Sequence, residues 1–177
     1  MAKATWVLDP AHTTAEFSVR HMMFTTVKGY FTKLEGQINA DLTDLTTGEI
    51  SATIDAASVE TRDAQRDGHL RSADFFDVEN HPKLTFKSYR IERTGENEYE
   101  LVGDLTIRGV TKSVIWSLSF DGQGKNPWGQ EVAGITAETK VNRKDFGLTW
   151  NAALEAGGWL VGDDVKIAIH AELIKQA

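Results

Sequence analysis

The feature that most constrains the fold is an alternation of apolar and polar residues that recurs in eight separate segments of the chain. In residues 30–42, Tyr30, Leu34, Ile38, Ala40 and Leu42 share one face of an extended chain, and their neighbours are mostly polar. Successive side chains of a β-strand point to opposite faces, so each segment predicts a strand with one buried and one solvated face. The pattern predicts an all-β protein built of antiparallel strands joined by turns.

The other seven segments repeat this alternation. Their buried faces comprise Phe17, Val19 and His21; Ile50, Ala52, Ile54 and Ala56; Leu84 and Phe86; Tyr99, Leu101, Gly103, Leu105 and Ile107; Val114, Trp116, Leu118 and Phe120; Ala133, Ile135, Ala137 and Val141; and Val165, Ile167, Ile169, Ala171 and Leu173. Eight such strands can close into a barrel, which removes the exposed edges of an open sheet.

The interior of an eight-stranded barrel is either filled by side chains or wide enough for one small ligand. Periodicity shows which residues are buried and not what fills the interior, so it does not distinguish a filled barrel from a hollow one. If the barrel is hollow, the candidates for its wall are Phe17, Val19, His21, Tyr30, Leu34, Ile38, Phe86, Leu101, Trp116 and Phe120.

Composition narrows the class of protein. The chain has 177 residues, of which 41% are hydrophobic and 25% charged, and this predicts one globular domain spanning residues 1–177. Its 19 Lys and Arg against 26 Asp and Glu give a formal net charge of −7, which disfavours general binding of nucleic acid and of anionic membrane surfaces unless basic residues cluster locally. The absence of cysteine excludes disulfides, thiolate metal ligands and cysteine nucleophiles.

No signal peptide and no membrane-spanning segment are recognisable. The first residues lack an apolar run of about 7 to 15 residues, and no stretch approaches the roughly 20 apolar residues that span a bilayer. The expectation is a cytoplasmic protein that does not span a membrane; a leader trimmed from the chain would instead mean a secreted or periplasmic one. The oligomeric state is open, with a homodimer as one expectation.

Residues 60–82 form the one long connection. The stretch TRDAQRDGHLRS (61–72) predicts a short polar helix that Thr61 or Ser58 could cap, with Leu70 as a candidate ligand contact. Phe75 and Phe76 follow between acidic residues. Two large rings in a connection need a surface to pack on, so we expect them to close one end of the barrel. The alternative is that they extend the core and gate nothing.

The same connection holds the densest group of basic residues. Arg66 and Arg71 are candidates to hold a phosphate or carboxylate head group by charge-assisted hydrogen bonds. Alternatively, the neighbouring aspartates take up these charges in local ion pairs. His21, on an inward face, is either a hydrogen-bonded core residue or a ligand contact.

The sequence predicts no catalytic residue, no metal site and no cofactor. Asp77, Glu79 and His81 would share a face of an extended chain, but Pro82 follows directly, which favours a solvated loop. The chain lacks both the HExxH pattern of zinc proteases and the G-x-S-x-G turn of serine hydrolases.

Five motifs resemble the YceI-like, polyisoprenoid-binding family: WVLDPAHTTAEFSVRHMMFTTVKGYF, GHLRSADFFDVENHPKLTFKS, GDLTIRGVTKSV, NRKDFGLTW and VGDDVKIAIHAEL. They occur in the order typical of the family and cover nearly the whole chain. The resemblance implies an extended, lipocalin-like, eight-stranded barrel whose apolar tunnel holds a long lipid tail, with the head group near one mouth. The resemblance implies a protein without catalytic activity. Members of the family are often secreted or periplasmic.

Three hypotheses follow. The first is a non-enzymatic carrier or sequestering protein for a polyisoprenoid, or for a fatty acid or fatty amide, held by burial of apolar surface. The second is an enzyme acting on a lipid-like substrate with His21 as general base. The third is a filled barrel that serves as a protein-interaction module.

Overall fold

A computed structural model describes residues 2–155 and 157–177 and shows an almost purely β architecture. Its described residues form eleven strands and one α-helix, α1 (Ala64–Arg71). The strands are β1 (Ala4–Leu8), β2 (Thr14–His21), β3 (Thr25–Phe31), β4 (Leu34–Asp41), β5 (Asp44–Asp55), β6 (Val59–Glu60), β7 (Lys83–Arg93), β8 (Glu98–Ile107), β9 (Val110–Lys125), β10 (Glu131–Asn142) and β11 (Val161–Lys175). Three short 3-10 helices, η1 (Pro10–His12), η2 (Ala56–Ser58) and η3 (Arg143–Phe146), lie between strands.

The strands close into the predicted antiparallel barrel. The eleven strands make eight barrel strands because three pairs of them are consecutive parts of one interrupted strand. η1 separates β1 from β2, a bend separates β3 from β4, and η2 separates β5 from β6. β11 completes the ring because its C-terminal part pairs with β1 and its N-terminal part with β2. The eight-stranded antiparallel barrel expected from the alternation is therefore confirmed.

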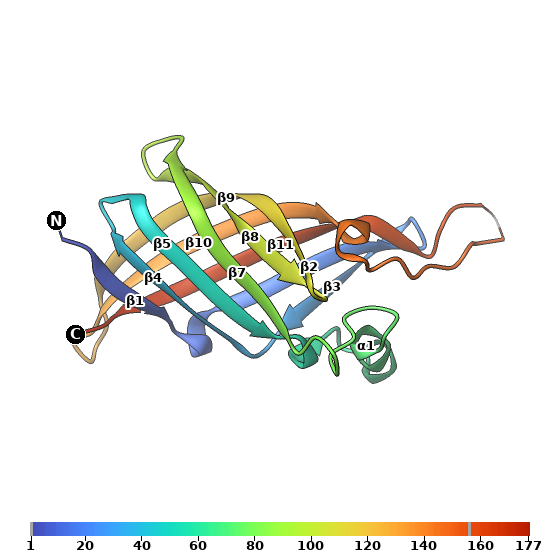
Figure 1. Ribbon diagram of the computed structural model, residues 1–177. Helices are drawn as coiled ribbons and strands as arrows, with labels where there is room; N and C mark the ends of the chain where they lie inside the picture. The colour runs from blue at the N-terminus through green and yellow to red at the C-terminus, as the bar shows by residue number, and fades with distance from the viewer. Residues whose placement is uncertain (1, 156) are drawn as a thin grey trace.

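The two ends of the barrel differ. Figure 1 shows both termini at one end, together with the turn between β7 and β8 and the turn between β9 and β10. α1, the β2–β3 turn and the long segment between β10 and β11 lie at the other end, which we call the mouth. Among the described strands, β6 pairs only with β3, so its other edge has no strand beside it. α1 lies in that region of the mouth.

The predicted inward faces are correct for most strands but wrong for Tyr30. Tyr30 is exposed and the Phe31 ring is buried, because the strand predicted over residues 30–42 breaks at Thr32 and Lys33. The break reverses which alternate residues face inward, so β3 buries odd-numbered residues and β4 buries Ile38 and Ala40.

The predicted helix is present but is capped differently. It begins after Asp63, whose carboxylate accepts hydrogen bonds from the backbone N–H groups of Gln65 and Arg66 at 3.0 and 3.1 Å. Thr61 instead donates its backbone N–H and its hydroxyl to the buried Asp67 carboxylate, at 2.8 and 2.5 Å. These bonds fix α1 to the chain that leaves β6. Its eight residues are too few for it to cross a membrane, and it is the one α-helix of the described chain.

Candidate functional site

The barrel encloses an apolar cavity with a volume of about 760 Å³. Along β11 its wall extends from Val161 to Ala171, which is about 33 Å of extended strand. Pockets of about 300 to 1,000 Å³ are typical of sites for small organic ligands. The interior is therefore hollow, and the filled-barrel alternative does not describe this structure.

Most of the candidate wall residues border the cavity. The predicted residues that do so are Phe17, Val19, His21, Leu34, Ile38, Arg66, Leu70, Phe75, Phe76, Phe86, Leu101 and Trp116.

Two glycines explain how a barrel with so many inward rings stays hollow. A Cβ atom at Gly29 would clash with the ring of Phe17 on the paired strand, and one at Gly103 would clash with the ring of Phe86. Each ring therefore lies against its neighbouring strand at a position where the strand has no side chain. This arrangement lines the wall with aromatic surface and leaves the centre open.

Three candidate site residues do not border the cavity. Tyr30 points outward because the strand breaks at Thr32 and Lys33. Phe120 is half-buried and packs against the core, but it pairs with Ile135 near the β7–β8 turn, at the end opposite the mouth. Arg71 donates from Nε to the carbonyl oxygen of Ala57 at 3.0 Å and from Nη2 to that of Val59 at 3.3 Å, so it anchors α1 instead of facing the interior.

Phe75 and Phe76 lie at the mouth and both border the cavity, as expected from the sequence. Phe75 is buried and stands nearly perpendicular to the ring of His69, at 5.0 Å between centroids, and it is 5.5 Å from Trp150. Phe76 packs edge-on against Phe31 at 5.5 Å. The two rings therefore fix the segment after α1 to both sides of the mouth.

Polar groups border the cavity at this same end. The Arg66 guanidinium donates from Nε to the Thr61 hydroxyl and from Nη2 to the Thr61 carbonyl, both at 2.7 Å. His69 Nε2 lies 2.8 Å from a carboxylate oxygen of Asp74. His21 also borders the cavity, and within the described chain its ring has no hydrogen-bond partner. A polar ligand group would meet these side chains at the mouth, whereas an apolar chain fits the interior.

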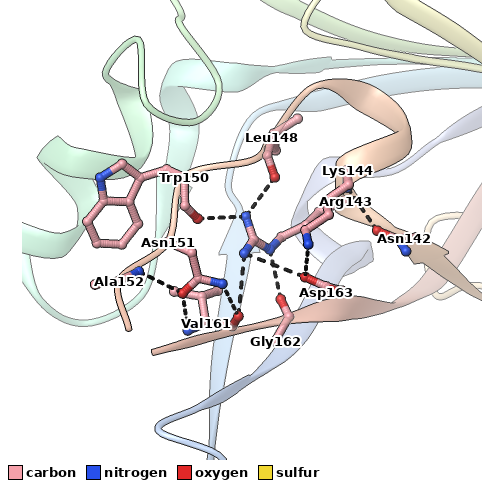
Figure 2. Close-up of polar contacts among 10 residues, drawn as sticks. All are labelled: Asn142, Arg143, Lys144, Leu148, Trp150, Asn151, Ala152, Val161, Gly162 and Asp163. Carbon is pink, nitrogen blue, oxygen red and sulfur yellow. Dashed lines mark hydrogen bonds and ion pairs between the residues drawn. The ribbon is translucent and has the colours of Figure 1, made fainter. Parts of the chain in front are cut away.

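A buried arginine that the sequence analysis did not single out organises the mouth. Arg143 in η3 is 4% exposed and borders the cavity. Figure 2 shows its guanidinium donating to the carbonyl oxygens of Leu148 at 2.6 Å, Trp150 at 2.9 Å and Gly162 at 2.8 Å. Arg143 thus joins the segment after η3 to the start of β11.

Charge and burial oppose each other at this arginine. Burial lowers the pKa of Arg143, and the Asp163 carboxylate, 3.9 Å from Nη2, acts in the opposite direction. An arginine in a protein stays protonated, so the site holds a buried positive charge that carbonyl dipoles stabilise. In the motif NRKDFGLTW, Arg143 stands between Asn142 and Lys144, and Lys144 is exposed, so the local sequence did not distinguish the buried cation from its neighbour.

The segment between η3 and β11 is further ordered by Asn151. Its side-chain amide donates to the carbonyl oxygen of Val161 at 2.7 Å, and its side-chain oxygen accepts from the N–H of Val161 at 3.0 Å (Figure 2). This pair of bonds imitates a strand pairing and brings Trp150 against the ring of His69 at 4.6 Å.

One group of side chains with possible metal-binding geometry lies away from the cavity. Asp9, His12 and Glu172 place their ligand atoms within 4.8 Å of one another, and none of them borders the cavity. The His12 Nδ1 atom lies 2.7 Å from Asp9 Oδ2 and 3.3 Å from Glu172 Oε2. The hydrogen bond that His12 donates to the Asp9 carboxylate raises the pKa of His12, and the same bond lowers the pKa of Asp9. This geometry is that of an exposed ion-paired cluster.

Comparison with known sequences identifies relatives of similar length. The model of the YceI-like domain matches residues 6–173. A UPF0312 protein of Staphylococcus epidermidis is 40% identical over 165 residues, which cover 93% of this chain and 94% of the relative. A UPF0312 protein of Staphylococcus aureus is 37% identical over 168 residues, or 94% of this chain and 95% of the relative.

Comparison with solved structures identifies the same barrel. BcnA of Burkholderia cenocepacia superposes with a TM-score of 0.81 at 25% identity, covering 93% of this chain and 98% of that one. The YCEI protein of Campylobacter jejuni gives 0.77 at 28% identity, covering 89% and 90%. A polyisoprenoid-binding domain from Saccharophagus degradans gives 0.72 at 15% identity, covering 98% and 99%, and shares the fold.

Proposed function

We propose that this chain, which belongs to the YceI-like family, binds one long-chain apolar lipid in its barrel and carries or sequesters it without chemical conversion. The observation that supports this proposal most directly is the elongated cavity of about 760 Å³ walled by aliphatic and aromatic side chains. Burial of each methylene contributes about 0.8 kcal/mol, so a tail of many methylenes can bind tightly without a specific polar contact.

The ligand class proposed is a polyisoprenoid or a fatty acid-like chain with its polar group at the mouth. The cavity is apolar along the barrel, and the basic groups Arg66 and His69 border it only where α1 lies. Arg66 already bonds to Thr61 through two of its nitrogens. Its remaining nitrogen, Nη1, is the donor we assign to a phosphate or carboxylate head group.

A lipid-converting enzyme is a weaker reading of the same cavity. A general base needs a proton to abstract within hydrogen-bond reach and is usually oriented by a second group. Within the described chain, the His21 ring has no carboxylate bonded to it. Stoichiometric binding without product would support the carrier, whereas turnover that disappears in a folded His21→Ala variant would support the enzyme.

The proposal is tested by native mass spectrometry of the purified protein, followed by solvent extraction of whatever dissociates. We expect an extra mass of one lipid per chain. An Ala137→Phe variant adds a ring inside the cavity, and Glu138→Phe adds the same ring on the exposed outer face of the same strand. We expect the first to lose the lipid and the second to keep it. A bare wild-type mass that persists after incubation with polyisoprenoids and fatty acids would refute the proposal.

A further inference from the structure

Four large apolar side chains are exposed together at the mouth. Met22, Met23 and Phe24 form the β2–β3 turn and are 43%, 57% and 81% exposed, and Trp159 in the segment before β11 is 59% exposed. We call these four residues the rim patch. The turn and the segment that carry them project from the end of the barrel opposite both termini (Figure 1). Contiguous exposed apolar surface of this kind is uncommon on a soluble protein and marks sites of interaction.

The two parts of the rim patch are joined to each other and to the mouth. The backbone N–H of Met22 donates to the carbonyl oxygen of Leu160 at 2.8 Å, and the Met23 sulfur lies directly over Gly158. His21 and Leu160, which adjoin the patch in sequence, both border the cavity. The exposed apolar surface is therefore continuous with the entrance to the apolar interior.

The backbone of the turn shows that its bulky residues are not there for local stability. Met22 and Met23 have φ values of 51° and 66°, a left-handed conformation that glycine and asparagine adopt far more readily than other residues. The chain uses two methionines instead, both partly exposed. Departures from local rules concentrate at functional sites, where another requirement overrides them.

The charge around the turn favours a particular partner. No acidic residue occurs between Glu16 and Glu35, and Arg20 and Lys28 flank the turn on β2 and β3, in a protein with a net charge of −7. Lys28 is ion-paired with Glu16 at 3.5 Å, so Arg20 is the cation next to the turn that has no carboxylate partner among the described residues. Arg20 lies two residues from Met22, or about 7 Å along an extended strand. Apolar faces of peripheral proteins enter a bilayer by about 5 to 10 Å, so insertion of the patch would bring Arg20 to the level of the lipid phosphates.

We propose that the rim patch docks on the interfacial region of a lipid bilayer and places the mouth of the barrel against it. Tryptophan and phenylalanine are suited to the membrane interface, and basic side chains just behind them can reach phosphate groups. The reason for docking rests on the proposed function, because a barrel that carries a membrane lipid must collect or deliver it at a bilayer. Docking itself depends only on the patch and its charges.

The experiment is flotation of the protein with vesicles of phosphatidylcholine and of phosphatidylcholine mixed with phosphatidylglycerol. The wild type is expected to float with both and more completely with the anionic vesicles. The double variant Phe24→Ser, Trp159→Ser is expected to lose vesicle binding by about tenfold or more, because it removes the two exposed rings. Trp128→Ser is the matched control, since Trp128 is 81% exposed in the β9–β10 turn at the other end, and it is expected to float like the wild type.

Two outcomes would overturn the inference. One is a wild-type protein that stays unbound with both vesicle types; if size-exclusion chromatography then shows a dimer that the double variant converts to a monomer, the patch is an interface between copies. The other is a double variant that floats like the wild type.

Binding of a soluble fluorescent fatty acid such as parinaric acid, measured without vesicles, keeps the two proposals apart. Flotation with no probe or lipid bound in the barrel would refute the proposed function alone, and probe binding without flotation would refute the docking alone.

Discussion

Replacing Arg143 by methionine should destabilise the mouth of the barrel far more than the removal of one charge would suggest. The side chain is 4% exposed, and its guanidinium holds three carbonyl groups at 2.9 Å or less. Two of those carbonyls, of Leu148 and Trp150, belong to the segment after η3, and the third belongs to Gly162 in β11. A methionine fills much of the same volume but donates no hydrogen bond.

The expected magnitude follows from these contacts. A hydrogen bond to a charged group contributes about 1.5 to 3 kcal/mol. The desolvation cost of the buried guanidinium disappears with it and offsets part of the loss. The three carbonyl groups then lack their donor, and each unsatisfied buried polar group costs about 1 to 3 kcal/mol, so the net cost after this offset is about 3 to 5 kcal/mol. We expect a loss of that size for Arg143→Met, against a total stability of about 5 to 15 kcal/mol for a domain.

The assay is equilibrium unfolding in urea, together with hydrogen exchange of the backbone amides between η3 and β11. Lys144→Met is the matched control, because it removes the same charge from the neighbouring residue, whose side chain is exposed and only ion-paired with Asp163 at 3.4 Å. The control should lose less than about 1 kcal/mol. An Arg143→Met variant as stable as the control, with unchanged exchange in this segment, would show that the carbonyl contacts do not stabilise the mouth.

Two further predictions concern the wall and the outer surface. Tyr30→Ser should change the free energy of unfolding by less than about 0.5 kcal/mol, whereas Phe31→Ser should cost about 3 kcal/mol or more in urea unfolding, because only the second ring is buried; equal effects would contradict the observed strand break. An NMR titration should give His12 a pKa above its usual value of about 6.5, and Asp9→Asn should bring it back toward that value. Since the folded pKa is raised, the stabilisation is complete below about pH 6.5 and is lost as pH rises through the folded value; a wild-type pKa at or below 6.5 would refute this pairing.

The walls of the barrel could be predicted from the sequence because a strand has a strict two-residue period. Alternation in segments such as residues 165–173 depends only on which face is buried, and β11 shows that face inward. The prediction failed where the period was interrupted. Nothing in residues 30–42 distinguishes a continuous strand from one that bends at Thr32 and Lys33, and one bend exchanges the inner and outer faces.

The polar contacts of the mouth could not be predicted because they join residues far apart in the chain. The sequence offered Arg66 and Arg71 as equivalent candidates, but Arg71 is turned toward Ala57 and Val59 by the way α1 leaves β6. Local composition also could not show that Asp63, and not Thr61, caps the helix, since both are good capping residues. The choice depends on the buried Asp67, which takes both donors of Thr61.

The distribution of unfavourable local features supports the mouth as the functional end of the barrel, independently of the cavity. Among the described residues, the non-glycine residues with positive φ are Met22, Met23, Arg62, Asp77 and Arg108, and all of them belong to turns or segments at the mouth. The buried charges of Asp67 and Arg143 lie there too. Such features cost free energy, and a fold retains them where the geometry they impose is needed. The regular alternation of the walls makes a container, and the strained, specifically bonded mouth is the end at which we place the proposed entry of the ligand.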